Sequence, residues 1–174
     1  MSLIGPLQAA RAARAVEGNL VGVSHYRREV HATREQVWAT LTNHSGWKQI
    51  PALREWFGRV EWYEGEPWQE GSRIVIEHYW PTQTDIQLVV LSITPKEEFS
   101  WIGHGRGLTA HQQVRFEPLA GGQSRITSRM EYVLAEGMID RSEAESVSDR
   151  LLRTFLDAIA DATERQVPPA ASDQ

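Results

Sequence analysis

Residues 142–166, SEAESVSDRLLRTFLDAIADATERQ, decide the fold of this chain. Their apolar residues recur at the spacing of one helical face, and Asp, Glu and Arg occupy the opposite face. Ser142 followed by Glu145 has the pattern of a capping box, and Pro168 shortly after Gln166 cannot continue a helix. Such a helix spans roughly 37 Å at about 1.5 Å per residue, so its apolar face needs an extended surface to lie on. The apolar face consists of Val147, Leu151, Leu152, Phe155, Leu156, Ile159 and Ala162.

Short strand-like runs fill most of the chain before this helix. They lie near residues 21–31, 57–64, 72–80, 85–94, 98–104, 108–117 and 124–134, separated by turn-forming residues. Connections this short favour antiparallel hairpins. After the first run, Thr33 with Gln36 marks the start of one short helix, and a second is expected over 47–53, broken at Pro51. The sequence therefore predicts an α+β fold: a curved, seven-stranded antiparallel sheet wrapped around one long C-terminal helix, with two short helices after the first strand.

The organisation along the chain is simple. Residues 21–167 are expected to form a single ligand-binding domain, since the chain shows no repeat and no linker that would divide it. Residues 1–20 are expected to form an N-terminal arm or a short helix. The small and polar residues 168–174 are expected to form a disordered tail.

Composition excludes several classes of function. The formal net charge of −5 argues against a nucleic-acid-binding protein. No apolar run is long enough to span a membrane, and Arg11 and Arg14 interrupt the place of a secretion signal, so a cytoplasmic location is expected. The chain has no cysteine, and His78, His104 and His111 lack the spacing of a zinc motif, so neither a metal site nor a cofactor is expected.

Two stretches resemble a known superfamily. Residues 28–41, REVHATREQVWATL, resemble the opening strand, turn and capped helix of SRPBCC (START-like) proteins. Residues 99–132, FSWIGHGRGLTAHQQVRFEPLAGGQSRITSRMEY, resemble the paired late strands of its polyketide cyclase/dehydrase branch. The resemblance implies a helix-grip fold with a deep apolar cavity between sheet and helix. Its members bind lipids, sterols, polyketides or hormones, and some catalyse cyclisation, so the fold alone implies only an apolar ligand.

Aromatic residues in the strands are candidates for lining that cavity. In the run 72–80, Ile76, His78 and Trp80 share one face, and Trp62 and Trp101 lie in neighbouring strand-like runs. Aromatic rings with a single polar atom suit a pocket that holds and orients an apolar ligand. The alternative is that these tryptophans are ordinary core residues.

The late strands offer further candidates. Alternation places Gln112 inward in one strand, and Ser128, Met130 and Tyr132 inward in the next. Buried polar groups need partners, which a ligand would supply; alternatively, these groups satisfy one another or the backbone. Phe155 of the long helix completes the predicted ligand-binding set. The glycine-rich residues 103–107 are interpreted as a flexible hairpin that gates the cavity.

Catalytic candidates are fewer. If Arg28 points inward it needs an anion, either a carboxylate such as Glu61 or Glu77 or an acidic group of the ligand. Because the polyketide cyclases that the chain resembles use arginine and tyrosine to polarise carbonyls, Arg28 with Tyr26 or Tyr132 is the catalytic hypothesis. An ion pair on the outer sheet is the alternative.

Three functions follow as hypotheses. The favoured one is a non-catalytic protein that binds a mostly apolar small molecule, such as a lipid or a polyketide. The second is a cyclase or aromatase-like enzyme, which requires a cation inside the pocket. The third is a protein-interaction module of the chaperone-activator type, which requires an exposed apolar patch on the outer sheet. The sequence leaves the oligomeric state open.

Overall fold

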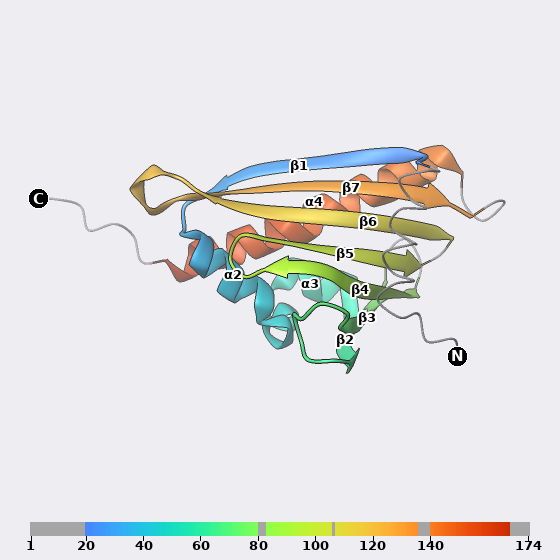
Figure 1. Ribbon diagram of the computed structural model, residues 1–174, viewed down its shortest axis with the longest axis horizontal. Coiled ribbons are helices and arrows are strands. Elements are labelled where there is room, and N and C mark those ends of the chain that lie inside the picture. Colours follow the sequence, from blue (N-terminus) through green and yellow to red (C-terminus); the bar gives the residue numbers. More distant parts are fainter. Residues whose placement is uncertain (1–19, 80–82, 106, 136–139, 168–174) are drawn as a thin grey trace, which may run out of the picture.

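The computed structural model describes residues 20–79, 83–105, 107–135 and 140–167. Within them, seven strands form one antiparallel sheet in the order β1-β7-β6-β5-β4-β3-β2 (Figure 1). The strands are β1 (Gly22–Val30), β2 (Phe57–Glu64), β3 (Arg73–His78), β4 (Thr84–Thr94), β5 (Glu98–Gly105), β6 (Leu108–Pro118) and β7 (Ser124–Leu134). The helices are α2 (Arg34–Thr42), α3 (Pro51–Trp56) and α4 (Arg141–Gln166), with 3-10 turns η1 (His44–Gln49) and η2 (Ala120–Gly122).

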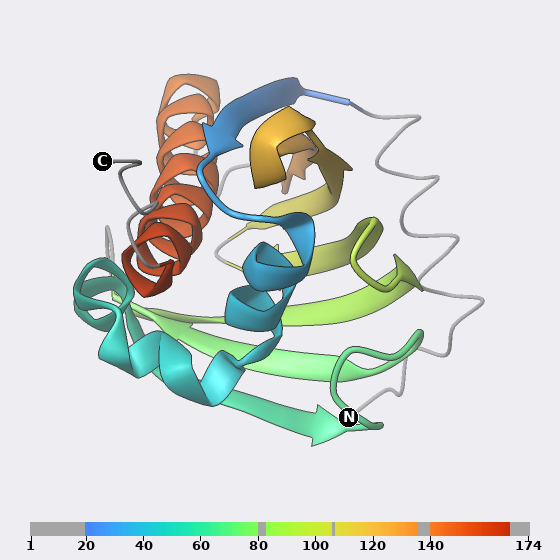
Figure 2. The same cartoon turned by 90° about the vertical axis from the view of Figure 1, so that its left-hand side faces the viewer.

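The sheet curves around α4, as the sequence predicts. Figure 2 shows α4 beside the concave face of the curved sheet, with α2 and α3 on the side nearest the viewer. The predicted helix-grip arrangement is therefore confirmed. The described chain has no helix of the length and apolar character that crossing a membrane requires.

The direction of the side chains in the late strands also follows the predicted alternation. On β6, Gln112 and Val114 are buried, whereas Arg115 between Val114 and Phe116 is exposed. On β7, Ser128 and Met130 are buried on either side of the exposed Arg129. The register of β6 with β7 is unbroken from end to end, which keeps both inward sets on one face.

The helix α4 begins earlier than the sequence pattern indicates. Its N-cap is Asp140, whose Oδ1 accepts a hydrogen bond of 2.8 Å from the backbone N–H of Glu143. The predicted capping box at Ser142 is therefore wrong by two residues. An aspartate at this position satisfies a free N–H and places its negative charge at the positive end of the helix dipole, so it competes well with serine. The predicted end at Gln166 is confirmed.

The short helices combine one confirmed and one corrected prediction. Thr33 and Gln36 form the predicted capping box at the start of α2, with both reciprocal hydrogen bonds present. The predicted interruption near Pro51 is present, but it separates the 3-10 turn η1, which ends at Gln49, from α3, which begins at Pro51 and continues to Trp56. Proline suits the first helical turn because its φ is already fixed there and its missing N–H would have no partner.

Candidate functional site

A cavity of about 130 Å³ lies between the concave face of the sheet and the N-terminal half of α4. Its walls come from β3 to β7 and from α4, with Phe57 at the start of β2. Most of the lining is aliphatic or aromatic, and no Asp, Glu, Lys or Arg is among these residues of the described chain. The lining residues are Phe57, Ile76, His78, Thr84, Ile86, Leu88, Trp101, Gly103, Gly105, Leu108, Ala110, Gln112, Met130, Val147, Leu151, Leu152 and Phe155.

Two glycines of β5 lie in the cavity wall. Gly103 and Gly105 alternate with Trp101 on the inner face of the strand, and both line the cavity. A Cβ at Gly103 would lie 2.6 Å from Leu88 Cδ2, and one at Gly105 would lie 3.1 Å from Ile86 Cγ1, so the side chains of β4 pack closely over both positions. The prediction of a flexible hairpin over 103–107 is wrong for its first part, because β5 continues through Gly105.

Polar groups interrupt the apolar lining at separate strands. His78 on β3 is 1% exposed, and its ring meets Trp56 edge-on with 5.4 Å between the ring centroids. Gln112 on β6 is 8% exposed and hydrogen-bonds to its neighbours on both sides. Thr84 stands opposite His78 at the start of β4.

The hydrogen bonds of Gln112 form a directed chain. Trp101 Nε1 donates to Gln112 Oε1 at 2.8 Å, Gln112 Nε2 donates to Ser128 Oγ at 3.2 Å, and Ser128 Oγ donates to the Gln113 carbonyl oxygen at 2.9 Å. An indole nitrogen only donates and a carbonyl oxygen only accepts, so both ends of the chain fix its direction. The predicted inward polar groups Gln112 and Ser128 thus satisfy each other in part, as the alternative interpretation held.

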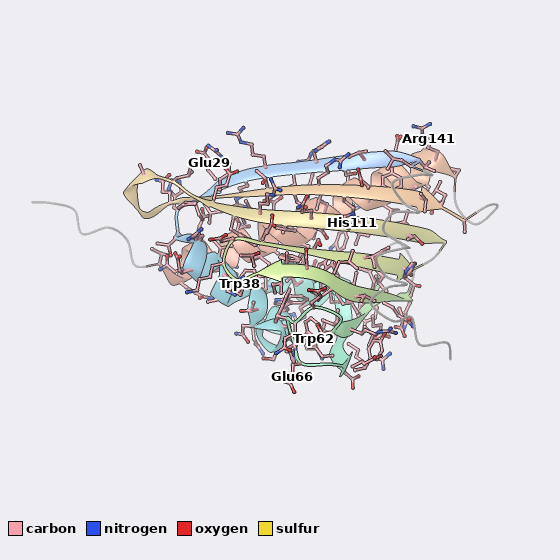
Figure 3. The ribbon with its side chains drawn as sticks, in the orientation of Figure 1. Glu29, Trp38, Trp62, Glu66, His111 and Arg141 are labelled. Atoms are coloured by element: carbon pink, nitrogen blue, oxygen red, sulfur yellow. The ribbon has the colours of Figure 1, made fainter. Side chains whose placement is uncertain are left out.

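An aromatic cluster closes the side of the cavity that faces α2. Trp68, in the loop between β2 and β3, has its ring centroid 6.0 Å from that of Trp101 and 5.4 Å from that of Trp62. Trp68 has a φ of 59°, which a bulky residue rarely adopts, and its Nε1 donates to the Thr42 carbonyl oxygen at 3.1 Å. The cluster consists of Trp38, Trp47, Phe57, Trp62, Trp68, Phe99, Trp101, Phe116 and Phe155. Trp38 and Trp62 are labelled in Figure 3.

The tryptophans therefore fill part of the interior and leave the rest open. Trp101 and Phe155, whose ring centroids are 6.2 Å apart, belong both to the aromatic cluster and to the cavity wall. The two interpretations of the aromatic residues, ligand contact and ordinary core, apply to different members of the set. Trp62 belongs to the cluster and does not line the cavity.

Of the remaining residues that were predicted to bind the ligand, some line the cavity and others do not. Trp80 lies outside the described residues. Tyr132 is 1% exposed but does not line the cavity; it packs against β1, where a Cβ on Gly22 would lie 2.1 Å from its hydroxyl oxygen. Burial raises the pKa of this hydroxyl above its ordinary value. The predicted residues that the structure brings together around the cavity are Ile76, His78, Trp101, Gln112, Met130 and Phe155.

Arg28 does not enter the cavity. Its guanidinium pairs with three carboxylates of α4, at 3.1 Å from Asp157, 2.5 Å from Asp161 and 2.9 Å from Glu164. The expected partners Glu61 and Glu77 are therefore wrong, because α4 lies against β1 and presents a carboxylate at each turn. Burial and the 2.7 Å hydrogen bond from Tyr26 to Asp157 raise the pKa of the tyrosine hydroxyl.

Sequence reasoning missed the part of the cavity that α4 and the middle strands contribute. Leu88, Ala110 and Leu151 line it, together with the two glycines of β5. Their apolar character marked them as core, and no feature of the sequence distinguishes a core residue that faces a void. Among the described residues, no group of three or more His, Asp or Glu side chains is arranged to hold a metal ion.

The sheet, the terminal helix and the apolar cavity between them define a protein of the helix-grip class. The chain belongs to the polyketide cyclase / dehydrase and lipid transport family, whose sequence profile matches residues 23–164. No curated protein matches the chain.

Solved structures share this fold at low sequence identity. The Zhui aromatase/cyclase from Streptomyces sp. R1128 is 16% identical with a TM-score of 0.71, over 87% of this chain and 98% of that one. A START superfamily protein from Mycobacterium smegmatis is 9% identical with a TM-score of 0.69, over 83% and 99%. Norcoclaurine synthase from Thalictrum flavum, in complex with dopamine and hydroxybenzaldehyde, is 14% identical with a TM-score of 0.65, over 85% and 89%. Identities this low establish the fold alone.

Proposed function

We propose that this protein binds a mostly apolar small molecule in the cavity between the sheet and α4. The observation that carries the proposal is the cavity of about 130 Å³ with an almost wholly apolar lining. Apolar lining that is left in contact with water forgoes favourable burial, about 25 cal/mol per Å², which an apolar ligand would recover. Gly103 and Gly105 also line this space, where the side chains of Leu88 and Ile86 pack over them. An apolar ligand that fills the space accounts for the apolar lining.

The cyclase alternative receives less support. It requires a cation that polarises a carbonyl within the pocket, and the described lining holds no lysine or arginine. Arg28 is engaged by three carboxylates on the far side of α4 from the cavity lining, and Tyr26 donates to one of them. The titratable group in the described lining is His78, and the other polar side chains there, Thr84 and Gln112, are uncharged.

The interaction-module alternative also lacks its predicted feature. It requires a continuous apolar patch on the outer face of the sheet. The large hydrophobic residues that are exposed in the described chain are Leu20, Tyr63 and Tyr79, at the end of β1, on β2 and just after β3. Charged residues such as Arg115 and Arg129 occupy the outer face of β6 and β7.

Native mass spectrometry of freshly purified protein, repeated after organic extraction, tests the proposal. An additional mass that extraction removes would show an occupied cavity and give the mass of the ligand. The Ala110→Leu variant, whose added side chain fills the cavity, is the control and should carry no additional mass. Retention of the same mass by this variant would place the ligand elsewhere and refute the proposal.

A further inference from the structure

We propose that the ligand is a neutral molecule of about one ring that carries a hydrogen-bond acceptor, and that Gln112 is the residue that selects it. This inference rests on the proposed function, since it concerns the chemistry of the same cavity. Three properties of the cavity carry it: the orientation of one amide, the absence of charge from the described lining, and the volume.

The amide of Gln112 can be oriented without ambiguity. Trp101 Nε1 lies 2.8 Å from one amide atom, and because an indole N–H only donates, that atom must be the oxygen. The other atom is therefore the nitrogen, which lies 3.2 Å from Ser128 Oγ. The hydroxyl of Ser128 donates its proton to the Gln113 carbonyl oxygen, so its oxygen accepts the hydrogen bond from the Gln112 amide.

This chain of bonds leaves one donor of the amide unused. The Nε2 group carries two protons, and Ser128 is its hydrogen-bond partner within the described residues. Gln112 is 8% exposed and lines the cavity. A buried N–H without an acceptor is unfavourable, so a ligand that brings an acceptor gains more than one that does not. The cavity wall therefore selects for a carbonyl or ether oxygen at the level of Gln112.

The lining also discriminates by charge. No Asp, Glu, Lys or Arg lies among the described residues around the cavity. An ionised carboxylate or amine placed there would lose its hydration without gaining a counter-ion, which is strongly unfavourable. Neutral ligands are therefore favoured over anions such as a fatty-acid carboxylate.

The volume limits the ligand to a small molecule. A cavity of about 150 Å³ in a protein core binds benzene, and the cavity here measures about 130 Å³. The aromatic cluster prevents its extension toward α2, because Trp68 and Trp101 lie with their ring centroids 6.0 Å apart across that side. One ring with a short substituent fills this space, whereas a fused polycyclic skeleton would have to extend out of the cavity.

A panel of probes separates these properties. Acetophenone, its near-isostere ethylbenzene, and benzoate are titrated against the full chain at pH 7 by calorimetry and by tryptophan fluorescence. Acetophenone should bind about 3- to 10-fold more tightly than ethylbenzene, the range that one net hydrogen bond supports. Benzoate should bind more weakly than both. In Gln112→Leu the preference for the ketone should disappear while ethylbenzene still binds, and Gln112→Met provides the same test if the first variant does not fold.

Ser128→Ala is the matched control. It removes one partner of the amide but leaves Gln112 held by Trp101, so the preference for the ketone should remain. The infrared carbonyl stretch of bound acetophenone adds a direct reading: a shift to lower frequency in the wild type that is absent in the Gln112 variants supports the hydrogen bond.

The outcomes separate this inference from the proposed function. Equal binding of ketone and hydrocarbon, or an unchanged ketone preference in Gln112→Leu, would overturn the role of Gln112 and leave the binding function standing. Tight binding of a fused tricyclic ketone with no binding of single-ring probes would overturn the size limit. Binding of no probe in the panel, together with a bare mass in the native spectrum, would remove the proposed function itself.

Discussion

Filling the cavity by Ala110→Leu should make the protein more stable and abolish ligand binding at the same time. The side chain of Ala110, on β6, already points into the cavity, so a leucine there extends into empty space. The cavity of about 130 Å³ is large enough to hold the added carbon atoms. The three added carbon atoms contribute about 2.4 kcal/mol at about 0.8 kcal/mol each.

Opposing terms reduce this gain. Ordering the leucine side chain costs about 0.5–1 kcal/mol, and any mismatch with its neighbours adds strain. We therefore expect the free energy of unfolding to rise by about 0.5–1.5 kcal/mol, or roughly 1–6 °C in Tm for a chain of this size. Binding of acetophenone should fall below detection, because the added carbons occupy the space that the ring needs.

Urea denaturation and ligand titration measure the two effects separately. Ala135→Leu is the matched control, because Ala135 is exposed just after β7 and the same substitution there should change neither quantity. A variant at position 110 that loses more than about 1 kcal/mol of stability yet binds normally would show that the cavity is not an empty space and not the binding site.

Three further perturbations test other parts of the structure. Arg28→Met should destabilise the protein by about 1–3 kcal/mol in urea denaturation, because it leaves three carboxylates of α4 without their counter-ion, and 1 M salt should reduce this loss by screening their repulsion. Arg141→Met, which breaks an exposed ion pair within α4, should change stability by less than about 0.5 kcal/mol. Equal effects of the two substitutions would show that Arg28 does not hold β1 and α4 together. Burial lowers the pKa of His104 below its ordinary 6.5, so the unfolded chain binds a proton more readily than the folded chain and the free energy of unfolding should fall as the pH drops below about 6.5. His104→Gln should weaken this dependence of stability on pH between pH 7 and 5. An unchanged dependence would assign it to another group. Trp68→Ala should lower the free energy of unfolding by about 2–4 kcal/mol in urea denaturation and should allow a two-ring ketone to bind in the cavity. A loss of stability below about 0.5 kcal/mol would show that this ring does not hold the aromatic cluster together.

Local patterns sufficed for most of the secondary structure. The strands β2 and β7 occupy the predicted residues 57–64 and 124–134; Gly65 follows the first, and Gly121 and Gly122 shortly precede the second, as turn-forming residues. The errors were local as well. The start of α4 was misplaced because Asp140, which precedes the capping pattern at Ser142, is an equally good cap.

The candidate site was predictable in part. Alternation along a strand placed Gln112 and Met130 on the inner face correctly, since period 2 is a property of each strand alone. The same reasoning placed Tyr26 and Arg28 on one strand but could not foresee that both would meet carboxylates of α4. That contact depends on how the helix lies across the sheet, which no spacing within β1 encodes.

The sequence by itself determined the order of the elements, the antiparallel sheet and the apolar face of the long helix, because each follows from interactions between near neighbours along the chain. Only the tertiary structure decided where the interior remains empty. Gly103 and Gly105 of β5 and Leu151 of α4 line the void, while Trp68 from a distant loop packs beside Trp101. Whether an inward side chain becomes core or cavity wall depends on residues far away in sequence that meet it only after folding.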